Sequence, residues 1–171
     1  MRLIEVVPYS EEWPVLFETD AAIIREILGD EVVEIHHIGS TSIPGLVAKP
    51  IIDILPVVKD IRRVDKYNQQ FIDVGYEPRG EFGLPGRRYF AKGGENRTHH
   101  LHIYQVGNSE IDRHLAFRDY MITHPEEAEA YAELKQSLAK QFPYDTPAYC
   151  DGKDEFIKER ERRALEWIKK R

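Results

Sequence analysis

With 171 residues, 42% of them hydrophobic and 11% aromatic, the chain has the size and composition of one globular domain, and we expect residues 1–171 to form it. The formal net charge of −6 argues against non-specific binding of nucleic acid, which requires a basic surface, but it allows a local anion site. The one cysteine excludes an internal disulfide, and neither a signal-peptide pattern nor an apolar run of about 20 residues is present, so we expect a soluble, cytoplasmic protein.

The first part of the sequence predicts strands and helices in alternation. Residues 3–7 form a short β-branched run that predicts a first strand. Apolar residues recur at helical spacing over 11–28 and again over 61–72. Residues 32–38 and 51–58 predict two further strands. The second of these is a continuous apolar run with a single charge, which is typical of a central strand buried on both faces.

The second part of the sequence predicts a hairpin, one more strand and then helices only. Residues 76–81 and 88–91 predict the hairpin strands, with a Gly/Pro turn region between them, and residues 99–106 predict the last strand. The helices are predicted at 109–123, 125–142 and 146–169. This order predicts an α+β fold, a mixed β-sheet with helices on one side and a helical C-terminal part.

The segment from Gly39 to Asp53 carries the most chemical information. Glycine lets a phosphate approach the backbone, and the Ser40 hydroxyl and exposed N–H groups can bind its oxygens. A carboxylate on the neighbouring strand can hold a metal ion that bridges such phosphates. The structural alternatives are a tight connection for the loop and a salt bridge from Asp53 to Lys49 or a nearby arginine.

A Gly-Ser pair followed by an aspartate on an apolar strand, about a dozen residues later, is similar to the signature of the polymerase-beta-type nucleotidyltransferases. That superfamily usually has a second carboxylate two residues after the first and a third on a later strand. Asp53 matches the first carboxylate, and Leu55 stands where the second is expected. The strand at 99–106 offers no acid, but it offers His100 and His102.

Several longer motifs resemble the GrpB family more specifically. They lie at 37–46, 49–54, 86–90, 100–102 and 114–120. The resemblance extends from residue 3 to about residue 157, with the motifs in the same order. It implies a nucleotidyltransferase-like fold, with a transferase or nucleotide-binding activity.

Asp53, His100 and His102 are the predicted catalytic and metal-binding residues. The two histidines are two positions apart on a strand, so both point to the same face, and together with Asp53 they can bind one metal ion if the two strands are adjacent. Two-metal phosphoryl transfer needs ligands for two ions about 3.5–4 Å apart, which one aspartate rarely supplies, and histidine suits Zn or Mn better than Mg. We therefore expect a divalent metal, Mg, Mn or Zn, with Glu81 and His37 as further candidate ligands. No organic cofactor is indicated, and the alternative is a purely structural histidine pair.

Small and basic residues are predicted to bind phosphate in a cleft between the sheet and the C-terminal helices. They are Gly39, Ser40, Thr41, Ser42, Lys49, Arg87, Arg88 and Arg118. Arginine suits bidentate phosphate contacts, but a solvated hairpin edge is the alternative for Arg87 and Arg88. Arg118 shares a helix face with His114, and pairing within the helix is its alternative.

Three functions agree with these residues. The first is an enzyme that transfers a nucleotidyl or phosphoryl group with a divalent metal. The second is a non-catalytic module that binds a nucleotide or another small phosphorylated molecule, which Leu55 favours because it replaces a carboxylate. The third is a metal-dependent hydrolase centred on Asp53, His100 and His102. The sequence leaves the substrate, the acceptor and the oligomeric state open.

Overall fold

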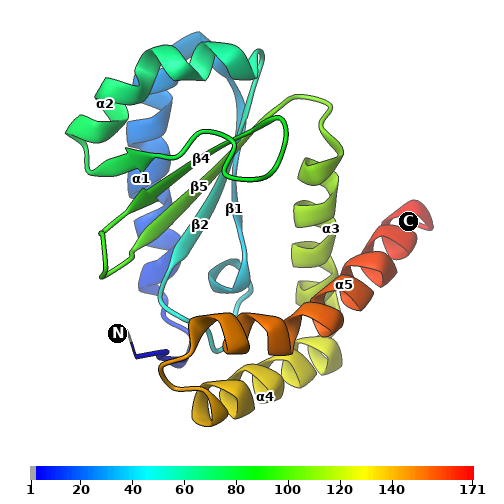
Figure 1. Cartoon of the computed structure of the whole chain (residues 1–171). Helices are drawn as coiled ribbons and strands as arrows, with labels where there is room; N and C mark the ends of the chain where they lie inside the picture. The colour runs from blue at the N-terminus through cyan, green and yellow to red at the C-terminus, as the bar shows by residue number, and fades with distance from the viewer. Residues whose placement is uncertain (1–2) are drawn as a thin grey trace.

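Five strands form one mixed β-sheet at the centre of the molecule, whose computed structural model describes residues 3–171 (Figure 1). The strands are β1 (Val32–Ile38), β2 (Ile52–Val58), β3 (Tyr76–Pro78), β4 (Arg87–Lys92) and β5 (His99–Gln105). Their order across the sheet is β1-β2-β5-β4-β3. Strands β2 and β5 run parallel, and the other neighbours are antiparallel. The central position of β2 agrees with its continuous apolar sequence.

Helices flank this sheet in two groups. They are α1 (Glu12–Leu28), α2 (Asn68–Asp73), α3 (Ser109–Thr123), α4 (Pro125–Gln141) and α5 (Thr146–Lys169), with 3-10 turns η1 (Gly29–Glu31), η2 (Ser40–Ser42) and η3 (Ile61–Tyr67). Helices α1 and α2 cover one face of the sheet. Helix α3 packs on the opposite face, and α4 and α5 lie next to α3 as the rest of a C-terminal group (Figure 1). The predicted α+β fold, with a mixed sheet and a helical C-terminal part, is confirmed.

The alternation of side chains along β2 divides the core between the two faces of the sheet. Ile52, Ile54 and Val58 pack in the larger cluster, together with residues of α1 and α2. Leu55 and Val57 point the other way and pack with side chains that include those of β5 and α3. Because Asp53 shares the face of Leu55, its carboxylate lies on the side of the C-terminal helices.

Three predicted elements differ from the structure. The first hairpin strand, expected at 76–81, ends as β3 at Pro78, and the residues after it belong to the turn region. Residues 3–7 were expected to form a strand, but Val7 makes only an isolated pair with Ala48, through two hydrogen bonds of 2.9 and 3.0 Å. The segment instead packs Ile4 against Leu138 and Tyr149 of the C-terminal helices. The helix predicted at 61–72 is divided into η3 and α2, and the Asp60 side chain accepts a hydrogen bond from the N–H of Arg62 at the start of η3.

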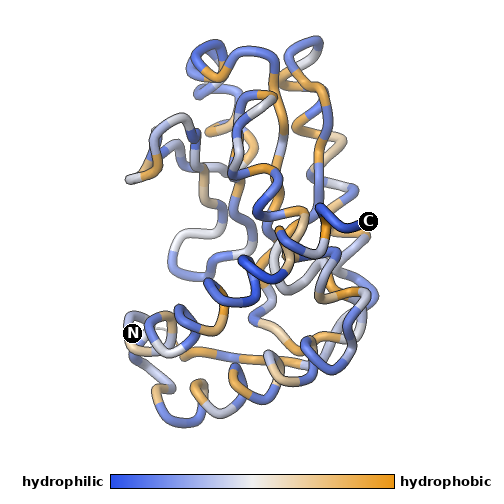
Figure 2. Tube along the Cα trace, turned by 90° about the vertical axis from the view of Figure 1, so that its right-hand side faces the viewer, coloured by the Kyte–Doolittle hydropathy of each residue, from blue (hydrophilic) through white to orange (hydrophobic). Residues whose placement is uncertain are grey.

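Polar and apolar residues alternate along the C-terminal helices, so each helix buries only part of its surface (Figure 2). Within residues 3–171, no helix combines the length and the apolar character that a membrane crossing requires. Gly152 lies inside α5, where a Cβ atom would be 2.5 Å from Cδ2 of Leu138 in α4. The missing side chain therefore allows α4 and α5 to approach closely.

Candidate functional site

Asp53, His100 and His102 lie together on the face of the sheet toward the C-terminal helices. The parallel register pairs Asp53 with His100, and His102 follows on the same face of β5. Oδ1 of Asp53 is 3.2 Å from Nδ1 of His100 and 3.1 Å from Nε2 of His102. One ligand atom from each residue lies within 4.8 Å of the others. One metal ion therefore has three donors within reach.

The turn that follows β1 packs against the carboxylate of Asp53. Gly39 has a φ of 74°, and a Cβ atom there would lie 2.6 Å from Oδ2 of Asp53. Only glycine leaves room for the carboxylate in this position. Thr41 is buried, and its hydroxyl contacts Nε2 of His37 at 2.9 Å and the carbonyl of Ile51 at 3.2 Å, while the Ser42 hydroxyl donates to the carbonyl of Gly39. These two hydroxyls hold the turn in shape.

A cavity of about 120 Å³ opens in front of Asp53, between the sheet and the C-terminal helices. It is lined by Ser40, Lys49, Ile51, Asp53, His100, Lys135, Tyr149 and Lys153. We call it the lysine pocket, because Lys135 of α4 and Lys153 of α5 meet Lys49 there. The sequence predicted a cleft at this place, and the helices contribute residues to it that the prediction did not include.

The three lysines of the pocket contact carbonyl and aromatic groups. Nζ of Lys135 donates to the carbonyl of Val47 at 2.9 Å and lies 4.7 Å from the centre of the Tyr131 ring. The ammonium groups of Lys49 and Lys153 lie 5.1 and 4.5 Å from the centre of the Tyr149 ring. In residues 3–171 the lysines that form ion pairs are Lys92, with Asp20, and Lys158, with Asp154, and neither lines the pocket. The positive charge of the pocket therefore has no carboxylate in direct contact.

Burial and neighbouring charges shift the pKa values of titratable groups in the pocket. Burial, followed by the ammonium groups of Lys153 and Lys49, lowers the pKa of Lys135 to about 6. Burial also lowers the pKa of Lys153. Burial by itself would raise the pKa of Asp53, but the hydrogen bonds from His100 and His102 outweigh it and hold that pKa below its usual range. The carboxylate is therefore charged at neutral pH, while burial of Lys135 and Lys153 disfavours their charged forms.

The donor set fits a transition metal better than magnesium. Nδ1 of His102 and the hydroxyl of Tyr149 are buried without a hydrogen-bond partner in the described structure. The ring of His114 lies 5.7 Å from that of His102, and burial, with the nearby Arg113 as the next cause, lowers the pKa of His114 to about 3. A single carboxylate with two imidazoles is typical of Zn, Mn or similar ions, whereas Mg prefers oxygen ligands.

Comparison with known proteins places this fold in a family. The family model described as GrpB protein matches residues 3–163. The chain belongs to the GrpB family. A crystal structure of the conserved protein GrpB from Enterococcus faecalis is similar, with 47% identity, a TM-score of 0.94, and coverage of 96% of this chain and 99% of that one.

A curated GrpB-family relative is longer than this chain. The UPF0157 protein YqkA from Bacillus subtilis is 48% identical over 170 residues, which cover 99% of this chain and 50% of YqkA. The chain thus spans about half the length of that relative. A structure of the Cid1 poly(U) polymerase bound to MgATP is more distant, with 12% identity, a TM-score of 0.48, and coverage of 76% of this chain and 45% of that one.

The two further ligand candidates of this GrpB-family chain lie outside the cluster. His37 precedes Ile38, the partner of Asp53 in the sheet, so its side chain points to the opposite face. There its ring stacks on Phe17 of α1, with ring centres 4.9 Å apart. Glu81 accepts a hydrogen bond of 2.7 Å from the N–H of Gly86 and so closes the hairpin turn.

The three arginines predicted to bind phosphate also have other contacts. Arg87 is buried, and its guanidinium donates to carbonyls of the hairpin turn at 3.2 and 2.9 Å. Arg88 points to the opposite face and pairs with Asp65 of η3 at 2.7 Å. Arg118 donates to the carbonyl of His37 at 3.1 Å and pairs with Asp119. Of the predicted phosphate ligands, Ser40 and Lys49 line the pocket, with Gly39 against its aspartate.

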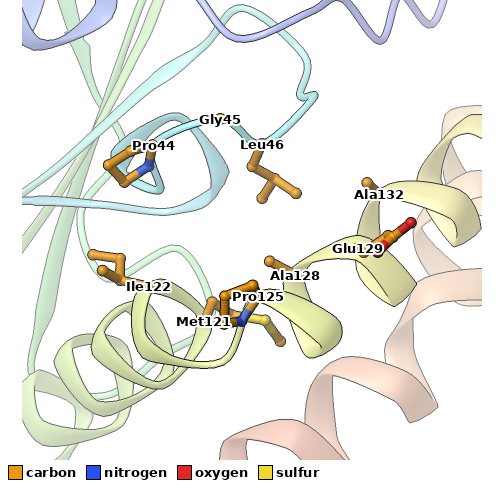
Figure 3. Close-up of a pocket in the computed structure, with 9 residues that line it drawn as sticks. All are labelled: Pro44, Gly45, Leu46, Met121, Ile122, Pro125, Ala128, Glu129 and Ala132. Atoms are coloured by element: carbon orange, nitrogen blue, oxygen red, sulfur yellow. The ribbon is translucent and has the colours of Figure 1, made fainter.

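Another hollow of the molecule has neither a set of metal ligands nor lysines in its lining. A groove of about 350 Å³ lies between residues 44–46 and the junction of α3 with α4 (Figure 3). It is lined by Pro44, Gly45, Leu46, Met121, Ile122, Pro125, Ala128, Glu129 and Ala132. Its side chains are apolar except for Glu129, so it offers neither a set of metal ligands nor a group of cations.

Lys135 and Lys153 are the charged residues of the pocket that the sequence interpretation missed, together with Ile51 and Tyr149. The signal for Lys135 was present, since Tyr131, Lys135 and Leu138 lie on one face of α4 and all three are buried. A lysine in the middle of an apolar stripe is unusual, because burial of an unpaired charge is unfavourable. Lys153 carried no such signal, because α5 has charged residues around much of its circumference.

Proposed function

We propose that this GrpB-family protein binds the phosphate end of a small molecule in the lysine pocket and transfers a nucleotidyl or phosphoryl group there. A divalent metal held by Asp53, His100 and His102 would assist the transfer. The observation that supports the proposal is that three lysines, none of which forms an ion pair within residues 3–171, line the same small cavity as Asp53 and His100 of the candidate metal cluster. Such a pocket is complementary to a strongly anionic ligand.

The size of the lysine pocket indicates which part of a ligand it can hold. Water occupies about 30 Å³ in the liquid, so about 120 Å³ corresponds to a few water molecules. One or two phosphate groups fit this space, whereas a whole nucleotide does not. A bound phosphate would satisfy the ammonium groups and the unpaired hydroxyl of Tyr149 together.

The residues of the pocket divide the work between them. Lys49 and Lys153 would neutralise the phosphate charge, Lys135 would take up a proton as the anion binds, and Ser40 would donate a hydrogen bond beside them. Asp53 would hold the metal as a charged carboxylate, since its pKa is below the usual range. The metal, when bound, would polarise a phosphoryl oxygen. Arg87 and Arg88 have no part in this scheme, because their guanidinium groups have other partners.

Metal binding is the first test of the proposal. We expect isothermal titration to show one Zn²⁺ or Mn²⁺ ion per chain, and at least about tenfold weaker binding in Asp53→Asn and His102→Gln. His36→Gln is the matched control, because His36 pairs with Glu34 on the edge strand β1. Absence of binding by Zn²⁺, Mn²⁺ and Mg²⁺ alike would overturn the metal centre.

Transfer activity is the second test. The protein is incubated with each of the four labelled nucleoside triphosphates, candidate hydroxyl acceptors and the metal that binds. Labelling of the acceptor and release of pyrophosphate or of the nucleoside diphosphate, the two possible leaving groups, are measured. We expect turnover that depends on Asp53 and is reduced at least about tenfold in Lys153→Gln, because the leaving phosphate loses a cation. Labelled products that form equally well with Asp53→Asn would contradict the proposal.

One observation favours a second function, binding without catalysis. Leu55 occupies the position of the second carboxylate and is fully buried among apolar side chains. The chain therefore has no second carboxylate beside Asp53, where two-metal enzymes place one. Saturable binding of nucleotides with no turnover under any of the metals above would favour this function over transfer.

A further inference from the structure

A larger cavity adjoins the lysine pocket. Its volume is about 600 Å³, and it shares Lys49 and Ile51 with the lysine pocket as a common wall. The N-terminal segment at Glu5, the first residue of α5 at Thr146 and the turn before β5 at Arg97 contribute to its other walls. Small-molecule sites commonly measure about 300–1,000 Å³, so this cavity has the size that the lysine pocket lacks.

Arg97 is the residue of this cavity whose contacts are incomplete. Its Nη1 atom is buried and has no hydrogen-bond partner, and the guanidinium forms no ion pair within residues 3–171. The backbone next to it is fixed, because the N–H of Thr98 donates to Lys92 and its carbonyl accepts from Ile52, both at 2.9 Å. Buried guanidinium nitrogens are normally paired, since an unpaired one loses its hydration without compensation.

We propose that the larger cavity holds the organic body of the ligand whose phosphate end occupies the lysine pocket, and that Arg97 recognises an acceptor group on that body. The inference rests on the proposed function for the position of the phosphates. Lys49, at the shared wall, would contact the junction between the two parts of the ligand. The ligand class is a phosphorylated molecule of nucleotide size with a carbonyl, carboxylate or second phosphate on its body.

This arrangement predicts separate roles for the two cavities in affinity and selectivity. The lysines recognise the phosphate end, which many ligands share, and contribute equally to the binding of all of them. Arg97 contacts only ligands that extend into the larger cavity, so it discriminates between them. Loss of a hydrogen bond to a charged group typically weakens binding roughly tenfold or more.

Titration without metal tests this inference separately from catalysis. Inorganic pyrophosphate and each nucleoside triphosphate are titrated in the presence of EDTA into wild-type protein, Arg97→Gln and Lys153→Gln. Arg62→Gln serves as the control, because Arg62 is highly exposed and pairs with Asp60 outside both cavities. We expect Lys153→Gln to weaken the binding of both kinds of probe. Arg97→Gln should weaken at least one triphosphate about tenfold and leave pyrophosphate unchanged.

The outcomes distinguish the two proposals. Equal affinity of Arg97→Gln and wild type for all four triphosphates, with pyrophosphate still bound, would overturn the role of Arg97 and leave the proposed function intact. No binding of pyrophosphate by the wild-type protein would remove the phosphate site and this inference with it. Unfolding midpoints of all variants are compared by thermal denaturation, so that a fold defect in Arg97→Gln is recognised and Arg97→Lys is measured in its place.

Discussion

Gly39 and Asp53 are in contact across the β1–β2 pair, and the carboxylate occupies the space that a side chain at Gly39 would fill. The antiparallel register places Ile38 opposite Asp53. Gly39, the next residue, therefore lies beside the carboxylate. Oδ2 of Asp53 would be 2.6 Å from a Cβ atom at Gly39. The positions of the candidate ligands Asp53, His100 and His102 therefore depend on Gly39, which contributes no side-chain atom to the cluster.

Gly39→Ala should displace Asp53 and weaken metal binding. The added Cβ overlaps the carboxylate, and the φ of 74° disfavours any residue with a side chain. We expect a loss of stability of about 1–2 kcal/mol and at least about tenfold weaker binding of Zn²⁺. Gly45→Ala is the control, because Gly45 has a φ of 81° but nothing within 4 Å of its Cβ position. Equal metal affinity in both variants would contradict the role of the contact.

Leu55→Asp, which restores the carboxylate pattern of nucleotidyltransferases, should destabilise the protein rather than activate it. Leu55 is fully buried and packs with Ile38 and Val57, so a carboxylate there has no partner. We expect a loss of about 3 kcal/mol or more in urea denaturation, against less than about 1.5 kcal/mol for Leu55→Met. A Leu55→Asp variant with wild-type stability would show that the sheet can accept a second carboxylate.

The low pKa of Lys135 predicts a dependence of stability on pH. Its pKa is about 6 in the folded state against 10.5 ordinarily, so the folded protein binds fewer protons than the unfolded chain between these values. The free energy of unfolding therefore rises with pH over this interval. In Lys135→Met this contribution is absent. We expect its stability relative to wild type to fall between pH 7 and pH 9, by at most about 1.4 kcal/mol per pH unit.

Urea denaturation of Lys135→Met and wild type at several pH values measures this difference. Lys140→Met is the matched control, because Lys140 lies on the exposed side of the same helix. Parallel curves for Lys135→Met and wild type would contradict the lowered pKa.

Gly152→Ala tests the close approach of α4 and α5. Alanine favours a helix over glycine by about 1 kcal/mol, but its Cβ would lie 2.5 Å from Cδ2 of Leu138. We expect the variant to lose about 1 kcal/mol of stability, because overpacking exceeds the gain in helix propensity. In a Leu138→Ala background the same change should stabilise the protein by about 1 kcal/mol. Additive effects in this double-mutant cycle would show that the helices adjust without strain.

The common face of His100 and His102 could be predicted because it depends on a local rule, that side chains two positions apart on a strand share a face. Their contact with Asp53 was expected only on the condition that the two strands are neighbours, and the pairing of β2 with β5 meets that condition. The sequence did not settle which face of the sheet His37 occupies. Its position next to the Gly-Ser turn suggested a site residue, but its register places it on the face covered by α1.

The sequence alone thus determined the α+β order of elements, the Gly39 turn and the common face of His100 and His102, because each follows from backbone conformation or from periodicity within one segment. The pairing of β2 with β5, which brings Asp53 to the two histidines, belongs to the tertiary structure. Tertiary structure alone decided that Lys135 and Lys153 join Lys49 in front of this cluster, and that Arg88 and Arg118 do not. The reason is physical. The contacts of α4 and α5 with the sheet depend on how helices distant in sequence pack, and no local pattern specifies that packing.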